Sequence, residues 1–137
     1  MRPSSIKKIL RVFIFVTIIS SLIIGCAKND DPATPDRDKF IGTWHVSAHG
    51  SQSGDQFWDM TISASNSSAE QILITNFDLQ RGTTTIAGVS GNNFSISSQH
   101  IGGVTVQGSG SYSGGSLTFH YTSTDTQTDD VNATAKK

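Results

Sequence analysis

From Phe40 to the end of the chain, apolar and polar residues alternate with a period of two. In "GTWHVSA", for example, Trp44 and Val46 fall on one face while His45 and Ser47 fall on the other. Side chains of a β-strand point alternately to opposite faces, whereas a helical stripe repeats about every 3.6 residues. The alternation therefore predicts half-buried strands and no substantial helix after residue 40.

Eight stretches carry this alternation, and short joints rich in Gly, Ser, Asn or Asp separate them. The predicted strands cover residues 42–48, 56–64, 71–77, 83–89, 93–97, 104–112, 116–123 and 130–136. Joints this short make neighbouring strands antiparallel, because a parallel crossover needs about a dozen residues or more. An eight-stranded meander can close and lose its exposed edges. The predicted fold class is all-β, a small eight-stranded antiparallel up-and-down barrel, with a two-sheet β-sandwich as the alternative.

Length and charge narrow the classes of function. A chain of 137 residues has room for one domain. The residues after Cys26 include six basic and eleven acidic side chains, so this part of the chain is mildly acidic. Nucleic-acid binding calls for a basic face with aromatic residues among the lysines and arginines. We therefore expect no nucleic-acid partner.

The first 25 residues are typical of a signal peptide. Four basic residues, Arg2, Lys7, Lys8 and Arg11, precede the apolar run "VFIFVTIISSLII" of residues 12–24. As a helix these residues would rise only about 20 Å, short of the roughly 30 Å hydrocarbon core of a bilayer. A cleaved signal peptide over residues 1–25 is the prediction. A transmembrane anchor beginning near Ile9 is the alternative.

The run ends in "LIIGC", Leu22 to Cys26, which resembles the lipobox of bacterial lipoproteins. The resemblance implies cleavage just before Cys26, a diacylglyceryl group on its thiol and an acyl chain such as palmitate on the freed amine. One acyl chain holds a protein only marginally, whereas two or three anchor it durably. A lone cysteine also cannot form an intramolecular disulfide. We expect Cys26 to be the lipidation site, with the membrane as its partner.

Residues 26–39 read as the lipidated cysteine and a flexible tether. "AKNDDPATPDRDK" has no large apolar residue before Phe40 and contains two of the three prolines, so it cannot bury enough surface to fold alone. Ala27 replaces the aspartate that commonly marks inner-membrane retention in such lipoproteins, which implies the outer membrane. The acidic pair in "KNDD" is similar to export signals of surface lipoproteins. Both the periplasmic side and the cell surface stay open.

Immediately after the tether, "DKFIGTWHVSA" resembles the opening of lipocalin-like and other calycin barrels, where a Gly-x-Trp closes one end. The resemblance implies a lipocalin-like domain over residues 40–137 that binds a small apolar molecule or a glycan. The chain is shorter than true lipocalins and lacks their final helix, which favours an interior filled by side chains. Five aromatic residues are candidates for either a ligand cavity or a packed core: Trp44, Trp58, Phe94, Phe119 and Tyr121.

Catalytic motifs are absent from the sequence, so we expect no enzyme, no cofactor and no metal. His45 and His49 share the solvent face of a strand, and we expect neither to have a carboxylate nearby. The acidic cluster Asp125, Asp129 and Asp130 does not have the spacing of a calcium loop. Two hypotheses follow: an envelope lipoprotein that binds a small apolar molecule or glycan, and a non-enzymatic structural or interaction module with a filled core and a protein or polysaccharide partner.

Overall fold

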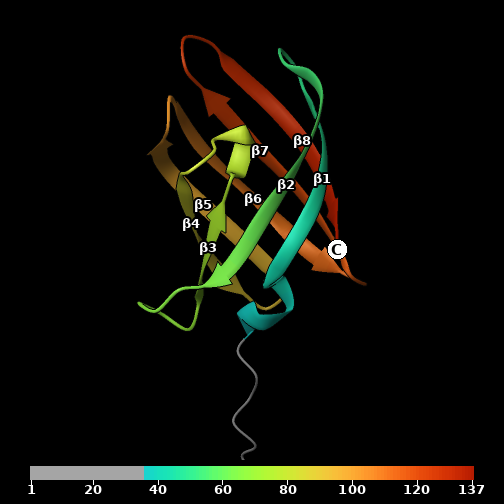
Figure 1. Cartoon of the computed structure of the whole chain (residues 1–137), viewed down its shortest axis with the longest axis vertical. Helices are drawn as coiled ribbons and strands as arrows, with labels where there is room; N and C mark the ends of the chain where they lie inside the picture. The colour runs from blue at the N-terminus through green and yellow to red at the C-terminus, as the bar shows by residue number, and fades with distance from the viewer. Residues whose placement is uncertain (1–35) are drawn as a thin grey trace, which may run out of the picture. The chain divides into compact units, whose positions relative to one another are not determined.

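The computed structural model describes residues 36–137, which form a closed antiparallel barrel of eight strands in sequential order (Figure 1). Each strand pairs with the next, and β1 also pairs with β8, so the sheet has no free edge. The predicted signal peptide and Cys26 lie outside the described residues. The elements are η1 (Asp36–Phe40), β1 (Gly42–Gly50), β2 (Gly54–Ala64), β3 (Gln71–Thr75), η2 (Phe77–Leu79), β4 (Thr84–Ser90), β5 (Asn93–Ile101), β6 (Val104–Ser113), β7 (Ser116–Thr124) and β8 (Thr128–Lys136).

The predicted barrel is confirmed, and the sandwich alternative is not what forms. The largest difference in strand length is in β5, which continues to Ile101 where the sequence pattern ended at residue 97. The register with β6 shifts between Ile96 and Gln99, and this bulge interrupts the alternation. The Gln99 amide then bonds to β4, accepting from the backbone N–H of Ile86 at 2.9 Å and donating to its carbonyl at 2.7 Å. A side chain therefore extends the β4–β5 pairing where the backbone ladder has ended.

The structure differs from the sequence prediction at residues 36–39, which were assigned to the tether and instead begin the 3-10 helix η1. Side chains of η1 hold it to the loops at one end of the barrel. Arg37 donates to the Ser65 carbonyl at 2.7 Å, and Lys39 donates to the Asn92 side chain at 2.7 Å. Asp36 accepts from the backbone N–H of Gly91 at 3.0 Å. Composition alone predicts that these charged residues are solvated. Their partners could not be predicted, because the loops that receive them are distant in the sequence.

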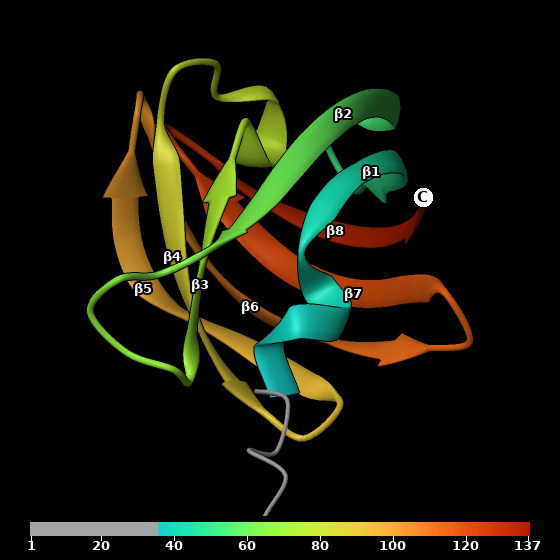
Figure 2. The same ribbon diagram turned by 60° about the horizontal axis from the view of Figure 1, so that its bottom comes forward.

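The end of the barrel that η1 covers, here called the plug end, is closed by aromatic packing. Figure 2, turned to bring this end forward, shows η1 lying across the opening and leading into β1. Phe40 and Trp44 are fully buried, and the indole Nε1 of Trp44 donates to the Phe40 carbonyl at 2.7 Å. Lys137 Nζ lies 4.8 Å from the centroid of the Trp44 ring, within cation–π distance. The Gly-x-Trp segment and the residues just before it thus close one end of the barrel.

A column of aromatic rings runs through the interior from the plug end to the opposite end, here called the mouth. Neighbouring ring centroids lie 4.7 to 6.3 Å apart, the range in which aromatic pairs attract one another. In order, the ring column consists of Trp44, Tyr112, Phe40, Phe94, Phe119, Tyr121 and Phe77. Aromatic side chains, rather than open space, therefore occupy the axis of the barrel.

Two glycines of β6 make room for the ring column. A Cβ atom on Gly110 would lie 2.4 Å from the Cβ of Phe119 and 2.5 Å from the ring of Phe94. A Cβ atom on Gly108 would lie 2.5 Å from the Cβ of Tyr121. Real carbon atoms do not approach so closely without displacement, so any larger residue would push the rings aside. The small side chains of β6 are thus the counterpart of the large ones on β5 and β7.

We predict that Trp44→Ala lowers the free energy of unfolding by roughly 3 to 5 kcal/mol, because it leaves a cavity beside Tyr112 and removes a buried hydrogen bond. Chemical denaturation of the two proteins measures the difference. Ile86→Ala, at a position 47% exposed on the outside of β4, is the control and should cost less than about 1 kcal/mol. A loss at Trp44 no larger than that of the control would contradict the role of this ring in closing the barrel.

Candidate ligand site at the barrel mouth

The mouth is formed by the loops at the end opposite η1, and it contains a pocket of about 460 Å³. The loops come from the β1–β2 turn, the segment containing η2, and the β7–β8 turn (Figure 1). The lining is polar, contains acidic but no basic side chains, and consists of Gln52, Ser53, Gln56, Asp78, Leu79, Gln80, Val104, Ser123, Asp125, Thr126, Gln127 and Asp129. A polar ligand with several hydrogen-bonding groups fits such a lining better than an apolar one.

The floor of the pocket is set by η2, whose Phe77 ring points into the barrel and packs on Tyr121 at 4.7 Å. Three residues around Phe77 have left-handed backbone conformations: Asn76 (φ 61°), Asp78 (φ 52°) and Leu79 (φ 60°). Asparagine and aspartate tolerate this region, whereas a leucine there is strained. Such strain persists only where surrounding contacts over-determine the conformation. Here the contacts are the buried Phe77 ring and the carboxylate of Asp78.

Asp78 ties η2 to β7. Its two oxygens accept hydrogen bonds from the hydroxyl of Tyr121 at 2.7 Å and from the hydroxyl of Ser123 at 2.6 Å. Burial raises the pKa of Tyr121 well above its ordinary value of 10.0, and the neighbouring Asp78 charge and its hydrogen bond raise this pKa further. Tyr121 therefore stays protonated and keeps donating to Asp78. This arrangement holds the pocket floor in place and leaves little of the Asp78 carboxylate for a ligand.

The other two carboxylates of the mouth also stabilise loops. Asp125 accepts from the backbone N–H groups of Gln127 and Thr126 in its own turn, and these bonds lower its pKa. For Asp129, partial desolvation opposes the shift, but hydrogen bonds from Ser53, Gln52 and Ser51 together lower its pKa. Both groups stay ionised because backbone donors are aimed at them. The acidic cluster noted in the sequence is thus used to shape turns.

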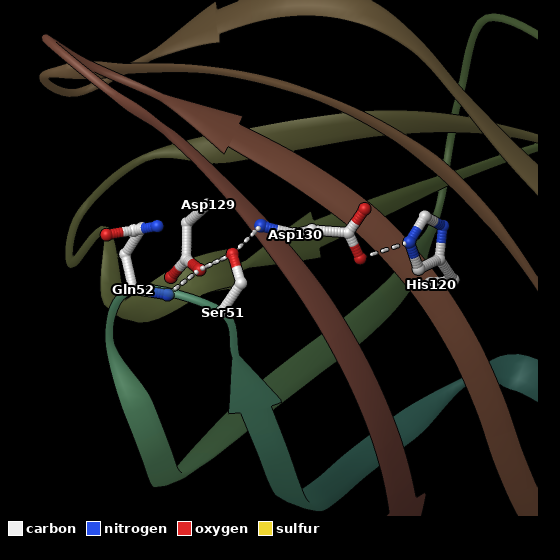
Figure 3. Close-up of polar contacts among 5 residues, drawn as sticks. All are labelled: Ser51, Gln52, His120, Asp129 and Asp130. Atoms are coloured by element: carbon white, nitrogen blue, oxygen red, sulfur yellow. Dashed lines mark hydrogen bonds and ion pairs between the residues drawn. The ribbon is translucent and has the colours of Figure 1, made fainter.

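A chain of polar contacts continues from the mouth onto the outer wall (Figure 3). The hydroxyl of Ser51 donates to Asp129 at 3.2 Å and accepts from the backbone N–H of Asp130 at 3.1 Å. The Asp130 carboxylate then lies 2.7 Å from Nε2 of His120 on β7. Ser51 therefore links the β1–β2 turn to β8, and each member of the Asp125, Asp129 and Asp130 group has a structural partner.

Glutamine amides are the groups of the pocket that remain available to a ligand. The side-chain amides of Gln52, Gln56 and Gln127 line the pocket and make no hydrogen bond to another residue of the described chain. Each amide offers an acceptor oxygen and two N–H donors. Groups that can donate and accept together suit hydroxyl-bearing ligands, because a hydroxyl needs both kinds of partner.

The structure buries all five aromatic residues proposed from the sequence, with exposed fractions of 0% for Trp44 and Tyr121 and no more than 7% for Trp58, Phe94 and Phe119. Four of them belong to the ring column, and Trp58 lies in the middle of β2, opposite Val46 of β1. None of the five lines the mouth pocket. Of the residues that do, the sequence analysis singled out Asp125 and Asp129 as an acidic cluster. It missed the others, since isolated glutamines and a turn aspartate such as Asp78 give no pattern to detect.

The statement that His45 and His49 lack a nearby carboxylate is wrong. Nδ1 of His45 lies 2.6 Å from Asp59, and Nδ1 of His49 lies 2.6 Å from Asp55. The two aspartates sit directly opposite the histidines in the β1–β2 register, so the hairpin joins residues that are 14 and 6 positions apart. The sequence did predict two adjacent strands here, but the contacts depend on their register.

Within residues 36–137, no group of three or more His, Cys, Asp or Glu side chains is arranged to hold a metal ion. In the same part of the chain, no helix has the length and apolarity needed to span a membrane. Each histidine–aspartate contact is a pair, so a cation would find two protein ligands there at most.

The fold and the pocket define a small closed β-barrel with a polar mouth. Among solved structures, the chain is similar to one described as a redesigned beta barrel, with a TM-score of 0.58 and 14% sequence identity over 77% of this chain and 96% of that one. An identity this low supports the shared fold alone. No protein-family model matches the chain, and no curated protein matches it.

We predict that the protein loses stability at alkaline pH through Tyr121. Because its pKa is raised in the folded state, Tyr121 contributes stability that is fully present below the unfolded pKa of about 10 and falls as the pH rises above it. The slope from this one group is up to about 1.4 kcal/mol per pH unit. Denaturant titrations between pH 9 and about pH 12 measure it. Tyr121→Phe should remove this part of the slope, whereas Tyr112→Phe should keep it; an unchanged slope in Tyr121→Phe would contradict the prediction.

Proposed function

We propose that the chain is a non-enzymatic lipoprotein of the bacterial cell envelope, anchored in the outer membrane by lipid on Cys26, whose barrel binds a glycan at its mouth. The observation that carries the ligand class is the set of glutamine amides without intramolecular partners in a pocket of about 460 Å³. A pocket of this volume accommodates a drug-sized or oligosaccharide-sized ligand. The absence of lysine and arginine from the lining favours a neutral glycan over an anionic one.

The ring column favours a glycan over a small apolar molecule inside the barrel. An apolar ligand would need interior volume that Phe119, Tyr121 and Phe77 occupy. A closed eight-stranded barrel has just enough interior to be filled by side chains or to hold one small ligand. With the axis filled, a ligand would bind outside the ring column, and the mouth pocket with its polar loop residues is the site we propose for it.

The position of η1 is compatible with the proposed anchor. The described chain enters the barrel at the plug end, and the pocket lies at the opposite end. A lipid on Cys26 would therefore be joined to the barrel at the end away from the ligand.

The second candidate function is that of a structural or interaction module. Such a module has a filled core and binds a protein or polysaccharide partner. The filled interior favours it, because a packed core makes a rigid scaffold for loops. A polysaccharide would use the same mouth amides as a short glycan. A protein partner would instead contact a broader surface, so the two are separated by whether a free oligosaccharide binds.

We predict that the full chain in detergent binds neutral oligosaccharides and that the double change Gln56→Ala and Gln127→Ala weakens this binding at least about tenfold. Each lost amide removes hydrogen bonds worth about 1 kcal/mol, and about 1.4 kcal/mol corresponds to a factor of ten in affinity. Isothermal titration against a panel of neutral oligosaccharides measures the affinities. Gln107→Ala, an exposed glutamine on the outer side of β6, is the matched control and should bind normally.

Two results would contradict the glycan proposal. One is an equal loss of binding in Gln107→Ala and in the double variant, which would make the effect unspecific. The other is preferential binding of a long-chain fatty acid over every oligosaccharide, which would return the ligand to an apolar site.

We predict that Cys26→Ser leaves the precursor unprocessed and abolishes its labelling by a fatty-acid analogue in cells. The thiol is the group that carries the lipid, and a serine hydroxyl is a much weaker nucleophile. Gly25→Ala keeps a small residue before the cysteine and should still be labelled. Persistent labelling of Cys26→Ser would sink the lipid-anchor proposal without affecting the glycan site.

A further inference from the structure

The outer side of the β1–β2 hairpin carries a large exposed apolar side chain. Phe57 is 74% exposed, compared with 47% for Ile86 and 40% for Leu79, the other exposed large hydrophobic residues of the described chain. Its cross-strand neighbour is Ser47, a small residue that leaves the ring unsupported on that side. Exposed aromatic rings of this kind commonly serve as anchors of protein interfaces.

Two histidine–aspartate pairs flank the Ser47–Phe57 pair symmetrically along the hairpin. His45 pairs with Asp59 on one side of it, and His49 pairs with Asp55 on the other, each at 2.6 Å. In both pairs the histidine is on β1 and the aspartate is on β2. The order of residue types along the two strands is therefore the same in both directions. We call these six residues the β1–β2 face: His45, Ser47, His49, Asp55, Phe57 and Asp59.

Two hollows border Ser47, and one of them also borders the Phe57 ring. One of about 460 Å³ is lined by six residues that include Ser47, Phe57 and the His45–Asp59 pair. Another of about 250 Å³ is lined by residues that include Ser47 and the His49–Asp55 pair. Ser47 borders both, so a shallow hollow and a projecting ring stand next to each other in the same row. A single copy leaves the ring in water and the hollow without a side chain.

We propose that the β1–β2 face binds the same face of a second copy of this chain, around a two-fold axis that runs parallel to the strands between β1 and β2. This axis sets β1 of each copy against β2 of the other. Phe57 then enters the hollow over Ser47 of the second copy. His45 faces Asp59 of the second copy, and His49 faces its Asp55. Such an isologous interface requires a self-complementary surface, and the register supplies one.

Charge selects this axis. A two-fold axis across the strands would set Asp55 against Asp59 of the second copy and His49 against its His45, and like charges placed together oppose association. With the axis along the strands, every carboxylate meets an imidazole. Carboxylates and imidazoles therefore alternate around each four-residue cluster, whereas the other axis would set carboxylate against carboxylate.

Each histidine–aspartate pair uses one ring nitrogen and one carboxylate oxygen, so the other nitrogen and the other oxygen can contact the second copy. The internal hydrogen bond joins Nδ1 of the histidine to Oδ1 of the aspartate. Nε2 of the histidines and Oδ2 of the aspartates make no hydrogen bond within the described chain. A protonated imidazole can then donate from Nε2 to Oδ2 of the second copy. Within one copy these pairs are more than 60% exposed, where an ion pair contributes little on its own.

The first experiment measures the mass of the full chain in nonionic detergent by sedimentation over a range of concentrations. The wild type should form dimers, and Phe57→Asp should raise the dimer dissociation constant at least about tenfold, since it removes the anchor and adds charge at the centre. Ile86→Asp, an equivalent change on the outside of β4, is the matched control and should leave dimerisation unchanged. Equal weakening by both variants would overturn the proposal.

A charge-swap experiment tests whether the charges of the β1–β2 face govern association. One variant carries His45→Asp and His49→Asp, and the other carries Asp55→Lys and Asp59→Lys. Each variant alone should be monomeric, because like charges face each other across the axis. A mixture should form a one-to-one heterodimer. Failure of the mixture to associate while wild type dimerises would show that this face is not the interface and would overturn the proposal.

The experiments also distinguish a second copy from other partners of the β1–β2 face. A wild type that stays monomeric at all concentrations would overturn the proposal. If Phe57→Asp then removed oligosaccharide binding, the ring would be a glycan platform instead. The mouth variant with Gln56→Ala and Gln127→Ala should still dimerise, so failure of the glycan proposal and failure of the dimer proposal give different results.

Discussion

The contact between aromatic rings along the barrel axis is the constraint on which the rest of the structure depends. A closed sheet of eight strands encloses a fixed width, and here the ring column fills it from Trp44 to Phe77. Two rings near opposite ends of the column come from short 3-10 segments: Phe40 from η1, in contact with Tyr112, and the terminal Phe77 from η2. Because these rings belong to the connections, packing the core also fixes the shape of both ends of the barrel.

The packing of the ring column also divides the polar groups of the mouth into two kinds. Some hold the loops in place, and others remain available to a ligand. Asp78 must stay beside Tyr121 and Ser123 because η2 brings Phe77 into the column at the cost of left-handed backbone at three residues. Asp125 and Asp129 are occupied by turn N–H groups. Carboxylates thus hold the loops, while the glutamine amides face the pocket. A charge count of the mouth alone would have suggested a cation site, whereas the hydrogen bonds show that Asp78, Asp125 and Asp129 are occupied within the protein.

The strands and the barrel could be predicted because alternation and turn residues are local in the sequence. Trp44, Phe94 and Tyr121 were recognised as inward-facing by the same rule. Contacts that depend on register or on distant loops could not be read this way: the pairing of His49 with Asp55 needs the hairpin register, and the docking of Arg37 on Ser65 needs the closed barrel. Apart from Asp125 and Asp129, the residues of the polar mouth were missed for a related reason, since they come from loops that only the barrel brings together.

The β1–β2 hairpin illustrates how one register serves both sides of a sheet. Its inward side places Trp44, Val46 and Trp58 in the core, and this burial allows no slip of one residue, because a slip would turn every side chain to the opposite face. The outward side inherits the same register without being buried. The symmetric row of histidines against aspartates around Phe57 is therefore held in place by the core beneath it. An exposed surface whose geometry is set by a buried one is already organised before any partner arrives, which lowers the entropic cost of association.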